Sequence, residues 1–193
     1  MRGGSLEHVL TFAKAKVAEV VQPGEVVVDA TLGNGHDMVH LAQCVGPAGH
    51  VYGFDVQAQA LEATRHRLQT QCPDVPVTLV EAGHETMGEV LSELAGQVAA
   101  VMFNLGYLPG GDKSRTTRPE TTLAALDQAM QLLRAQGILS IVKYLGHPGG
   151  SEEGDAVDVW AQQLDPDKAV VLSYKFINLP NTPPELLLVE KRA

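Results

Sequence analysis

The sequence predicts a doubly wound α/β fold, in which a mostly parallel sheet of seven strands carries an antiparallel strand at one edge. Two observations predict this fold. Short apolar segments rich in β-branched residues alternate with segments of helical periodicity, and this alternation is typical of parallel sheets that have helices on both faces. The last two apolar segments are joined only by the stretch 178–184, which favours an antiparallel pair.

The first half of the chain begins with a predicted helix. Apolar residues from Leu6 to Val20 recur at helical spacing, so we expect a helix over 5–21 with Ser5 as its N-cap. Pro23-Gly24 then breaks the chain. The elements expected next are a strand at 25–30, a helix at 36–44, a strand at 49–55, a helix at 57–70, a strand at 75–81, a helix at 85–94 and a strand at 98–104.

The second half contains two Gly-rich loops, 105–118 and 146–154. The elements expected around them are a helix at 119–134, a strand at 138–144, a helix that ends at 164, and strands at 169–177 and 185–191. The absence of an internal repeat or a low-complexity linker predicts one domain over 1–193. Parallel sheets bind ligands at the carboxyl ends of their strands, and both loops fall on that edge.

Composition excludes several classes of protein. Of 193 residues, 45% are apolar and 19% charged, which is a globular composition. No apolar run approaches the length of a membrane span, and residues 1–5 lack a signal-like apolar core, so we expect a cytoplasmic protein without membrane contact. Cys44 and Cys72 form neither a metal motif nor a disulfide framework. The net charge of −9 argues against non-specific DNA coating.

A nucleotide-like site is predicted after the first strand. Gly33 and Gly35 lie in the turn that begins at Asp29, and Asp55 ends the next strand 20 residues after Gly35, where a carboxylate can accept both ribose hydroxyls of an adenosine. A dinucleotide fingerprint needs a third glycine, but Met38 occupies its place, and the neighbouring Asp37 would repel a phosphate. A cationic cofactor without phosphate, S-adenosylmethionine (SAM), suits this turn better.

Two histidines extend this end of the site. Gly83-His84 follows the third strand, where the adenine edge would lie, although His84 could equally be a surface loop residue. His36 begins a helix and could make a polar contact there.

The acceptor end of the site is predicted at 103–112. Phe103-Asn-Leu-Gly-Tyr107 resembles the Asn-Pro-Pro-Tyr loop of amino-group methyltransferases. The side-chain oxygen of Asn104 and the next carbonyl can accept the two hydrogens of an amine and leave its lone pair aimed at a methyl donor, which is catalysis by orientation. Tyr107 can stack on a planar base, and Asp112 is a candidate proton acceptor.

Basic residues crowd the same loop. Lys113, Arg115 and Arg118 lie near a helix N-terminus, whose dipole prefers anions, so we expect them to bind phosphate groups of a substrate. Tyr144 and His147, which follow the fifth strand on the same edge, are further candidates for substrate contact. No metal site is predicted.

These motifs together resemble the YtqB-like, MnmM-type family of SAM-dependent tRNA methyltransferases, formerly labelled rRNA methylases. The resemblance covers nearly the whole chain and is carried by 29–37, 103–114, 146–148, 176–178 and Pro183-Pro184. It implies a Rossmann-like class I SAM methyltransferase, commonly a homodimer. The substrate that it implies is the tRNA anticodon stem-loop, in which 5-aminomethyl-2-thiouridine at wobble position 34 becomes the 5-methylaminomethyl form. The cofactor-binding residues that it implies are Asp29, Thr31, Gly33, Asn34, Gly35, His36, Asp37, Asp55, Val56, Gly83, His84, Asn104 and Leu105.

Other readings of the chain stay open. The same SAM site could serve rRNA or a small amine; the acidic net charge favours the small amine, and the basic loop favours RNA. A nicotinamide-dependent oxidoreductase conflicts with the missing third glycine and with Asp37. A non-catalytic SAM-binding module conflicts with the intact loop from Asn104 to Tyr107.

Overall fold

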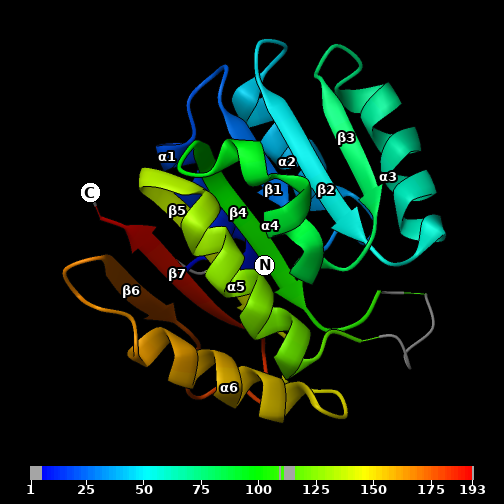
Figure 1. Ribbon diagram of the computed structural model, residues 1–193. Coiled ribbons are helices and arrows are strands. Elements are labelled where there is room, and N and C mark those ends of the chain that lie inside the picture. Colours follow the sequence, from blue (N-terminus) through cyan, green and yellow to red (C-terminus); the bar gives the residue numbers. More distant parts are fainter. Residues whose placement is uncertain (1–5, 109, 111–115, 193) are drawn as a thin grey trace.

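A computed structural model describes residues 6–108, 110 and 116–192 (Figure 1). Its elements in chain order are α1 (Val9–Val20), β1 (Val26–Asp29), α2 (His36–Val45), β2 (His50–Asp55), α3 (Ala58–Gln71), β3 (Val77–Glu81), η1 (His84–Thr86), α4 (Met87–Val90), η2 (Ser92–Leu94), β4 (Val98–Leu105), α5 (Pro119–Leu132), β5 (Leu133–Lys143), α6 (Gly150–Gln162), β6 (Ala169–Tyr174) and β7 (Glu185–Lys191).

The strands form one seven-stranded sheet in the order β3-β2-β1-β4-β5-β7-β6. Strands β1 to β5 pair in parallel, whereas β7 runs antiparallel to both β5 and β6. The predicted fold class is therefore confirmed, and β7 is the strand that joins the parallel sheet, with β6 outside it. The strand order reverses between β1 and β4, and ligands of such sheets bind at this switch point.

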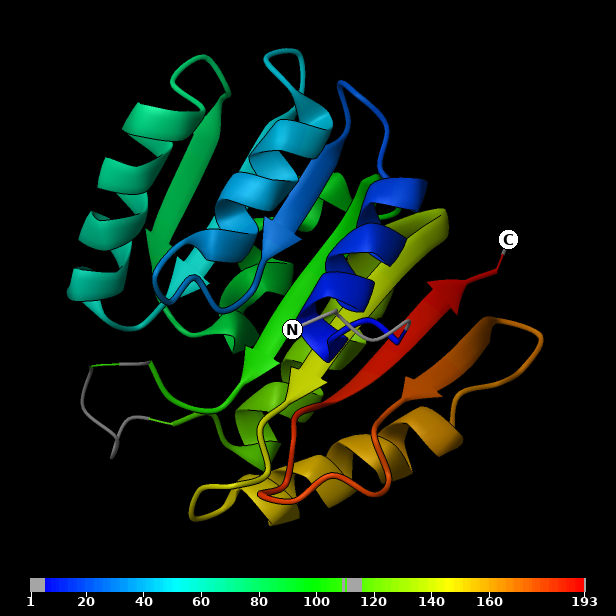
Figure 2. The ribbon, with the colours of Figure 1, turned by 180° about the vertical axis from the view of Figure 1, so that it is seen from behind.

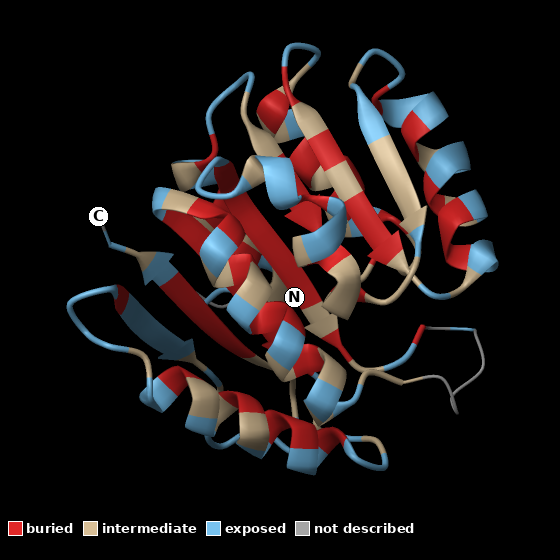
Figure 3. Cartoon of the chain, viewed as in Figure 1, coloured by how far each residue is buried: buried red, intermediate tan, exposed pale blue. Residues whose placement is uncertain are grey.

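Helices cover both faces of the sheet. Figure 2 shows α1, α2 and α3 on one face, and Figure 1 shows α4, α5 and α6 on the other. Each face has its own apolar core, which includes Met38 and Leu41 on the first side and Phe103, Leu126 and Ile141 on the second. The central strands are buried along most of their length (Figure 3). No helix within the described ranges is long and apolar enough to cross a membrane.

The prediction of one continuous helix over 85–94 is wrong. The structure has instead η1, a single α-helical turn and η2. The side chain of Gln128 on α5 accepts a hydrogen bond from the Gly88 N–H at 2.7 Å and donates one to the Glu85 carbonyl at 2.7 Å. These contacts from α5 take backbone groups that a continuous helix would pair internally.

Other boundaries differ at element ends. Helix α1 begins at Val9 with His8 as its N-cap; Ser5, the predicted cap, lies outside the described residues. Strand β5 begins at residue 133 rather than 138, directly after α5. Strand β6 ends at Tyr174, where its ring stacks on Phe12 and its hydroxyl donates to the Glu7 carbonyl.

Candidate active site

A cavity of about 550 Å³ lies where β1, β2, β3 and β4 end, next to the loop after β4. This volume lies within the range of roughly 300–1,000 Å³ that is typical of small-molecule sites. The cavity is lined by Ala30, Thr31, Gly33, Phe54, Asp55, Val56, Gln57, Ala82, Gly83, His84, Glu85, Asn104, Gly106, Tyr107, Leu108, Thr116, Thr117, Arg118 and Thr121.

The turn after β1 is held by Asp55 at the end of β2. One carboxylate oxygen of Asp55 accepts the Gly33 N–H at 3.0 Å, and the other accepts the Gln57 N–H at 2.9 Å. Burial raises the pKa of Asp55, and these backbone N–H groups partly offset the shift. Gly35 has a φ of 76°, and a Cβ there would lie 2.9 Å from the Thr64 backbone, so only glycine fits.

Asp29 lies beneath this turn and does not line the cavity. It is fully buried; Oδ1 accepts the Thr31 N–H at 3.1 Å, and Oδ2 has no hydrogen-bond partner within the described ranges. Burial, together with the charge of Asp37, raises the pKa of Asp29 to about 8. A neutral Asp29 therefore underlies the turn at pH 7.

His84 forms one buried wall of the cavity, so the surface-loop reading is wrong. It is 7% exposed, its ring meets Phe103 edge to face, and Thr122 Oγ1 lies 3.5 Å from Nε2. Burial lowers the pKa of His84, while Glu85 and a hydrogen bond with the Ala30 backbone act in the opposite direction. Burial thus favours the neutral form of the imidazole.

Asn104 lines the cavity near the end of β4 and is held from two sides. Its backbone N–H donates to Thr31 Oγ1 at 2.7 Å, and its side-chain Nδ2 donates to Asp37 Oδ2 at 2.6 Å. Asp37 in turn forms an ion pair with Lys14 of α1, with 2.8 Å between Nζ and Oδ1. These contacts join the turn after β1, α2 and α1 to the predicted acceptor end.

The loop after β4 closes on itself at its base. The Thr117 N–H donates to the Gly106 carbonyl at 3.0 Å, and Tyr107 bridges to Thr116. Glu153 on α6 is 1% exposed and accepts the Thr117 hydroxyl at 2.6 Å. Its other oxygen accepts the hydroxyl of Thr122 on α5 at 2.6 Å. Sequence reasoning missed Glu153, because nothing in a helical Glu-Glu pair marks a buried anchor.

The structure brings together only part of the predicted site. The predicted residues that line the cavity are Thr31, Gly33, Asp55, Val56, Gly83, His84, Asn104, Tyr107 and Arg118. Those described but absent from its lining are Asp29, Asn34, Gly35, His36, Asp37, Leu105, Tyr144 and His147. Asp112, Lys113 and Arg115 lie outside the described residues. Sequence reasoning missed the lining threonines Thr116, Thr117 and Thr121, whose only signal was their place at the end of the Gly-rich loop and in the helix that follows it.

Several of the predicted residues outside the lining still lie near the site. The His147 ring meets Tyr107 edge to face, with 5.7 Å between centroids, and its Nδ1 pairs with the Pro148 carbonyl. Burial raises the pKa of Tyr144, and the charge of Asp37 adds to the shift. His36 is exposed at the start of α2. The Asn34 carbonyl accepts a hydrogen bond from Nε of Arg67 at 2.9 Å.

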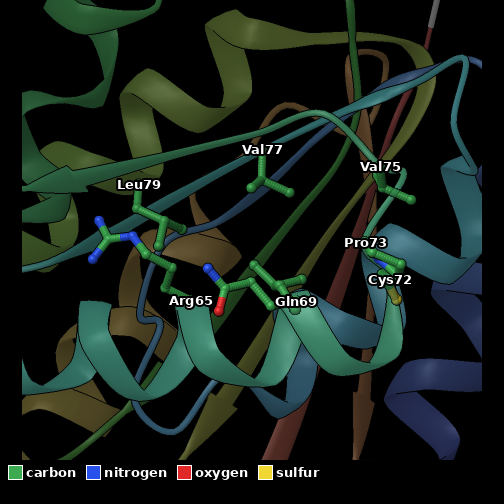
Figure 4. A pocket seen from close by; sticks show the side chains of 8 residues that line it. Arg65, Gln69, Cys72, Pro73, Val75, Val77 and Leu79 are labelled. Atoms are coloured by element: carbon green, nitrogen blue, oxygen red, sulfur yellow. The ribbon is translucent and has the colours of Figure 1, made fainter.

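A second hollow of about 250 Å³ lies between α3 and β3, away from these residues (Figure 4). None of the described predicted residues lines it. Within 6–108, 110 and 116–192, no group of three or more His, Cys, Asp or Glu side chains is placed to hold a metal ion.

The family whose sequence profile matches the chain is described as "Putative rRNA methylase", and the match spans residues 51–190. A chloroplastic tRNA (mnm(5)s(2)U34)-methyltransferase of Arabidopsis thaliana is 38% identical over 177 residues. The aligned region is 86% of this chain but 63% of that relative, so the chain spans less than two thirds of its length.

Two solved structures are similar over almost the whole chain. The structure of a protein named as a "putative rRNA-methylase", from Clostridium thermocellum, has a TM-score of 0.92 and is 42% identical in sequence. The similarity covers 97% of this chain and 100% of the Clostridium chain. A methyltransferase by name from Streptococcus mutans, crystallised in complex with SAH, has a TM-score of 0.86 at 35% identity and covers 96% and 99% of the two chains.

Proposed function

Because the chain belongs to the family described as "Putative rRNA methylase", we propose that it is a SAM-dependent methyltransferase that acts on an amino group of tRNA. The match covers more than half of the chain. The name of the Arabidopsis relative supports tRNA as the substrate, and the SAH in the Streptococcus structure supports SAM as the cofactor.

The cavity fits SAM at its nucleotide end. Asp55 carries two backbone hydrogen bonds on its two oxygens, and each oxygen has a further lone pair for a ribose hydroxyl. Gly83 and the neutral His84 line the far wall, where an uncharged adenine ring can be held. Asp37 does not line the cavity, so the exclusion of a pyrophosphate by its charge stays a prediction from the sequence. When bound, SAM supplies a methyl group activated by a sulfonium.

The observation that carries the proposal is the fixed amide of Asn104 at the cavity wall. Nδ2 is bound to Asp37, so Oδ1 is the arm that can accept a hydrogen from a substrate amine. An amine that donates to this oxygen and to a neighbouring carbonyl has its lone pair aimed at the methyl donor. Tyr107 and Arg118 line the same cavity, and we assign stacking on the base to Tyr107 and phosphate binding to Arg118. Asp112 remains the candidate proton acceptor.

The specific reaction that we propose is methylation of 5-aminomethyl-2-thiouridine at wobble position 34. The test is mass spectrometry of tRNA nucleosides from a deletion strain, together with methyl transfer by purified protein. Accumulated aminomethyl-2-thiouridine that disappears on adding protein and SAM supports the proposal. Methylation of rRNA or of a free small amine in place of tRNA contradicts it.

We propose further that residues 1–193 form one methyltransferase domain, since a single sheet takes strands from both halves of the chain. Homodimer formation and a cytoplasmic location are also proposals; the Arabidopsis relative is named as chloroplastic. Light scattering on the purified protein measures its mass in solution, and a monomer across the micromolar range contradicts the dimer.

A further inference from the structure

A chain of polar contacts runs from helix α1 through helix α2 to the end of β4. Lys14 Nζ lies 2.8 Å from Asp37 Oδ1, and Asp37 Oδ2 accepts Nδ2 of Asn104 at 2.6 Å. The Asp37 side chain is only 13% exposed, and Lys14 also donates to the His36 carbonyl at 3.4 Å. Each oxygen of this carboxylate thus has its own partner.

The chemistry of the three groups fixes which way the Asn104 amide faces. An ionised carboxylate only accepts hydrogen bonds, and an ammonium only donates them. The NH₂ arm of Asn104 must therefore face Asp37, and Oδ1 must face away. Thr31 accepts the backbone N–H of Asn104 at the same time, so the backbone from which this side chain extends is also held in place.

We propose that Lys14 and Asp37 are a positioning pair that selects the orientation of the Asn104 amide, so that its oxygen meets the substrate amine. The proposal rests on the proposed function and assigns a role to two residues outside the cavity lining. Neither residue touches the substrate; both act through Asn104.

The isosteric substitution Asp37→Asn is predicted to reverse the Asn104 amide. The introduced amide must turn its oxygen toward Lys14, because the ammonium has no acceptor to offer. Its NH₂ arm then takes the place of Oδ2 and faces Asn104. Asn104 can keep a hydrogen bond there only by turning its own oxygen toward position 37, which leaves an NH₂ facing the substrate amine.

This argument predicts a rescue that simple structural damage cannot produce. In the double variant Lys14→Met/Asp37→Asn, nothing requires the introduced oxygen to face α1. The introduced amide can rotate and accept Nδ2 of Asn104, as the carboxylate does. The second substitution should therefore restore activity that the first one removes.

The experiment measures single-turnover methylation of tRNA bearing 5-aminomethyl-2-thiouridine, with SAM saturating. We expect the rate to fall about a hundredfold in Asp37→Asn, as for loss of one oriented polar group in a dry site. SAM affinity should stay within about twofold, because the pair does not contact the cofactor cavity. The double variant should recover about tenfold over Asp37→Asn. Lys16→Met is the matched control on the same helix, since the Lys16 ammonium pairs with Glu19 and lies over the Phe12 ring rather than contacting Asp37, and it should leave the rate unchanged.

A second readout does not depend on activity. In isotope-labelled protein, Asn104→Ala identifies the side-chain amide signals of Asn104 by their disappearance. A short hydrogen bond to a carboxylate deshields one of the amide protons, and this shift should be lost in Asp37→Asn. Unmoved signals, or a double variant no faster than Asp37→Asn, overturn the proposal. If wild-type protein methylates no aminomethyl uridine, the proposed function fails, and the amide signals alone decide the orientation.

Discussion

Replacing Asp55 with alanine tests the cofactor end of the site. Its carboxylate accepts two backbone N–H groups, from the turn after β1 and from the start of α3. Asp55→Ala therefore removes two contacts from the fold and, in the proposed complex, the acceptor of the ribose hydroxyls. The substitution should lower both the stability of the free protein and its affinity for SAM.

The two effects have different sizes. Hydrogen bonds to a charged group contribute roughly 1.5–3 kcal/mol each, but burial raises the pKa of Asp55, so part of this gain already offsets desolvation. A net loss of about 1–3 kcal/mol in the free energy of unfolding corresponds to a fall of roughly 2–12 °C in Tm for a domain of this size. Losing the ribose contacts costs about 1–3 kcal/mol of binding, which is roughly tenfold to a hundredfold in Kd.

Titration calorimetry with SAM and thermal unfolding measure the two quantities separately. Asp55→Asn keeps one acceptor oxygen and should fall between wild type and Asp55→Ala in both. Glu81→Ala is the matched control, because Glu81 ends the neighbouring strand in register with Asp55 but is exposed and absent from the cavity lining. Wild-type SAM affinity in Asp55→Ala would remove Asp55 from the site, and tighter binding of NAD than of SAM would overturn the cofactor assignment.

Three further predictions concern the acceptor, the buried carboxyl and the substrate. Asn104→Ala should lower kcat about a hundredfold with little change in SAM or tRNA affinity, and wild-type turnover would end the amine-alignment mechanism. The Asp29 carboxyl has a pKa of about 8 in the folded protein and of about 3.8 in the unfolded chain, so the folded protein binds the extra proton between these values. The wild-type protein should therefore lose stability relative to Asp29→Asn as the pH rises from 3.8 to about 8. Urea unfolding across that range checks this, and a constant difference contradicts it. Arg118→Ala should flatten the salt dependence of tRNA binding by roughly 0.7–0.9 in log–log slope and leave SAM binding unchanged. An unaltered slope would make Arg118 a solvated loop residue.

Much of the fold could be predicted because it depends on local pattern. A strand followed by a tight turn is predicted by the β-branched run before Asp29 and the glycines after it, and the structure contains both. The failed helix at 85–94 has another cause. There the backbone is paired by Gln128, some 40 residues away along the chain, and no periodicity reports a tertiary hydrogen bond.

The site was predictable at its strand ends and not beyond them. Asp55 and Asn104 stand where strands stop at the ligand-binding edge, and topology alone brings them to one cavity. Glu153 reaches the same region from α6, through threonines more than 30 residues away in sequence. Only the packing of α6 against α5 reveals this contact, so the sequence carried no signal for it.

The structure gives Asp37 a role that the sequence did not predict. A carboxylate after this turn is expected to repel a phosphate, and this expectation favoured SAM over a dinucleotide. In the fold the same carboxylate does not line the cavity, and it binds Lys14 with one oxygen and Asn104 with the other. Lys14 donates to one oxygen of this carboxylate, and the other oxygen accepts Nδ2 of Asn104, so the Asn104 amide has a single favourable orientation. The negative charge near the cofactor turn and the oriented oxygen at the acceptor end therefore depend on the same carboxylate, and Asp37→Asn on its own should remove both, whereas the added Lys14→Met substitution should restore the orientation without the charge.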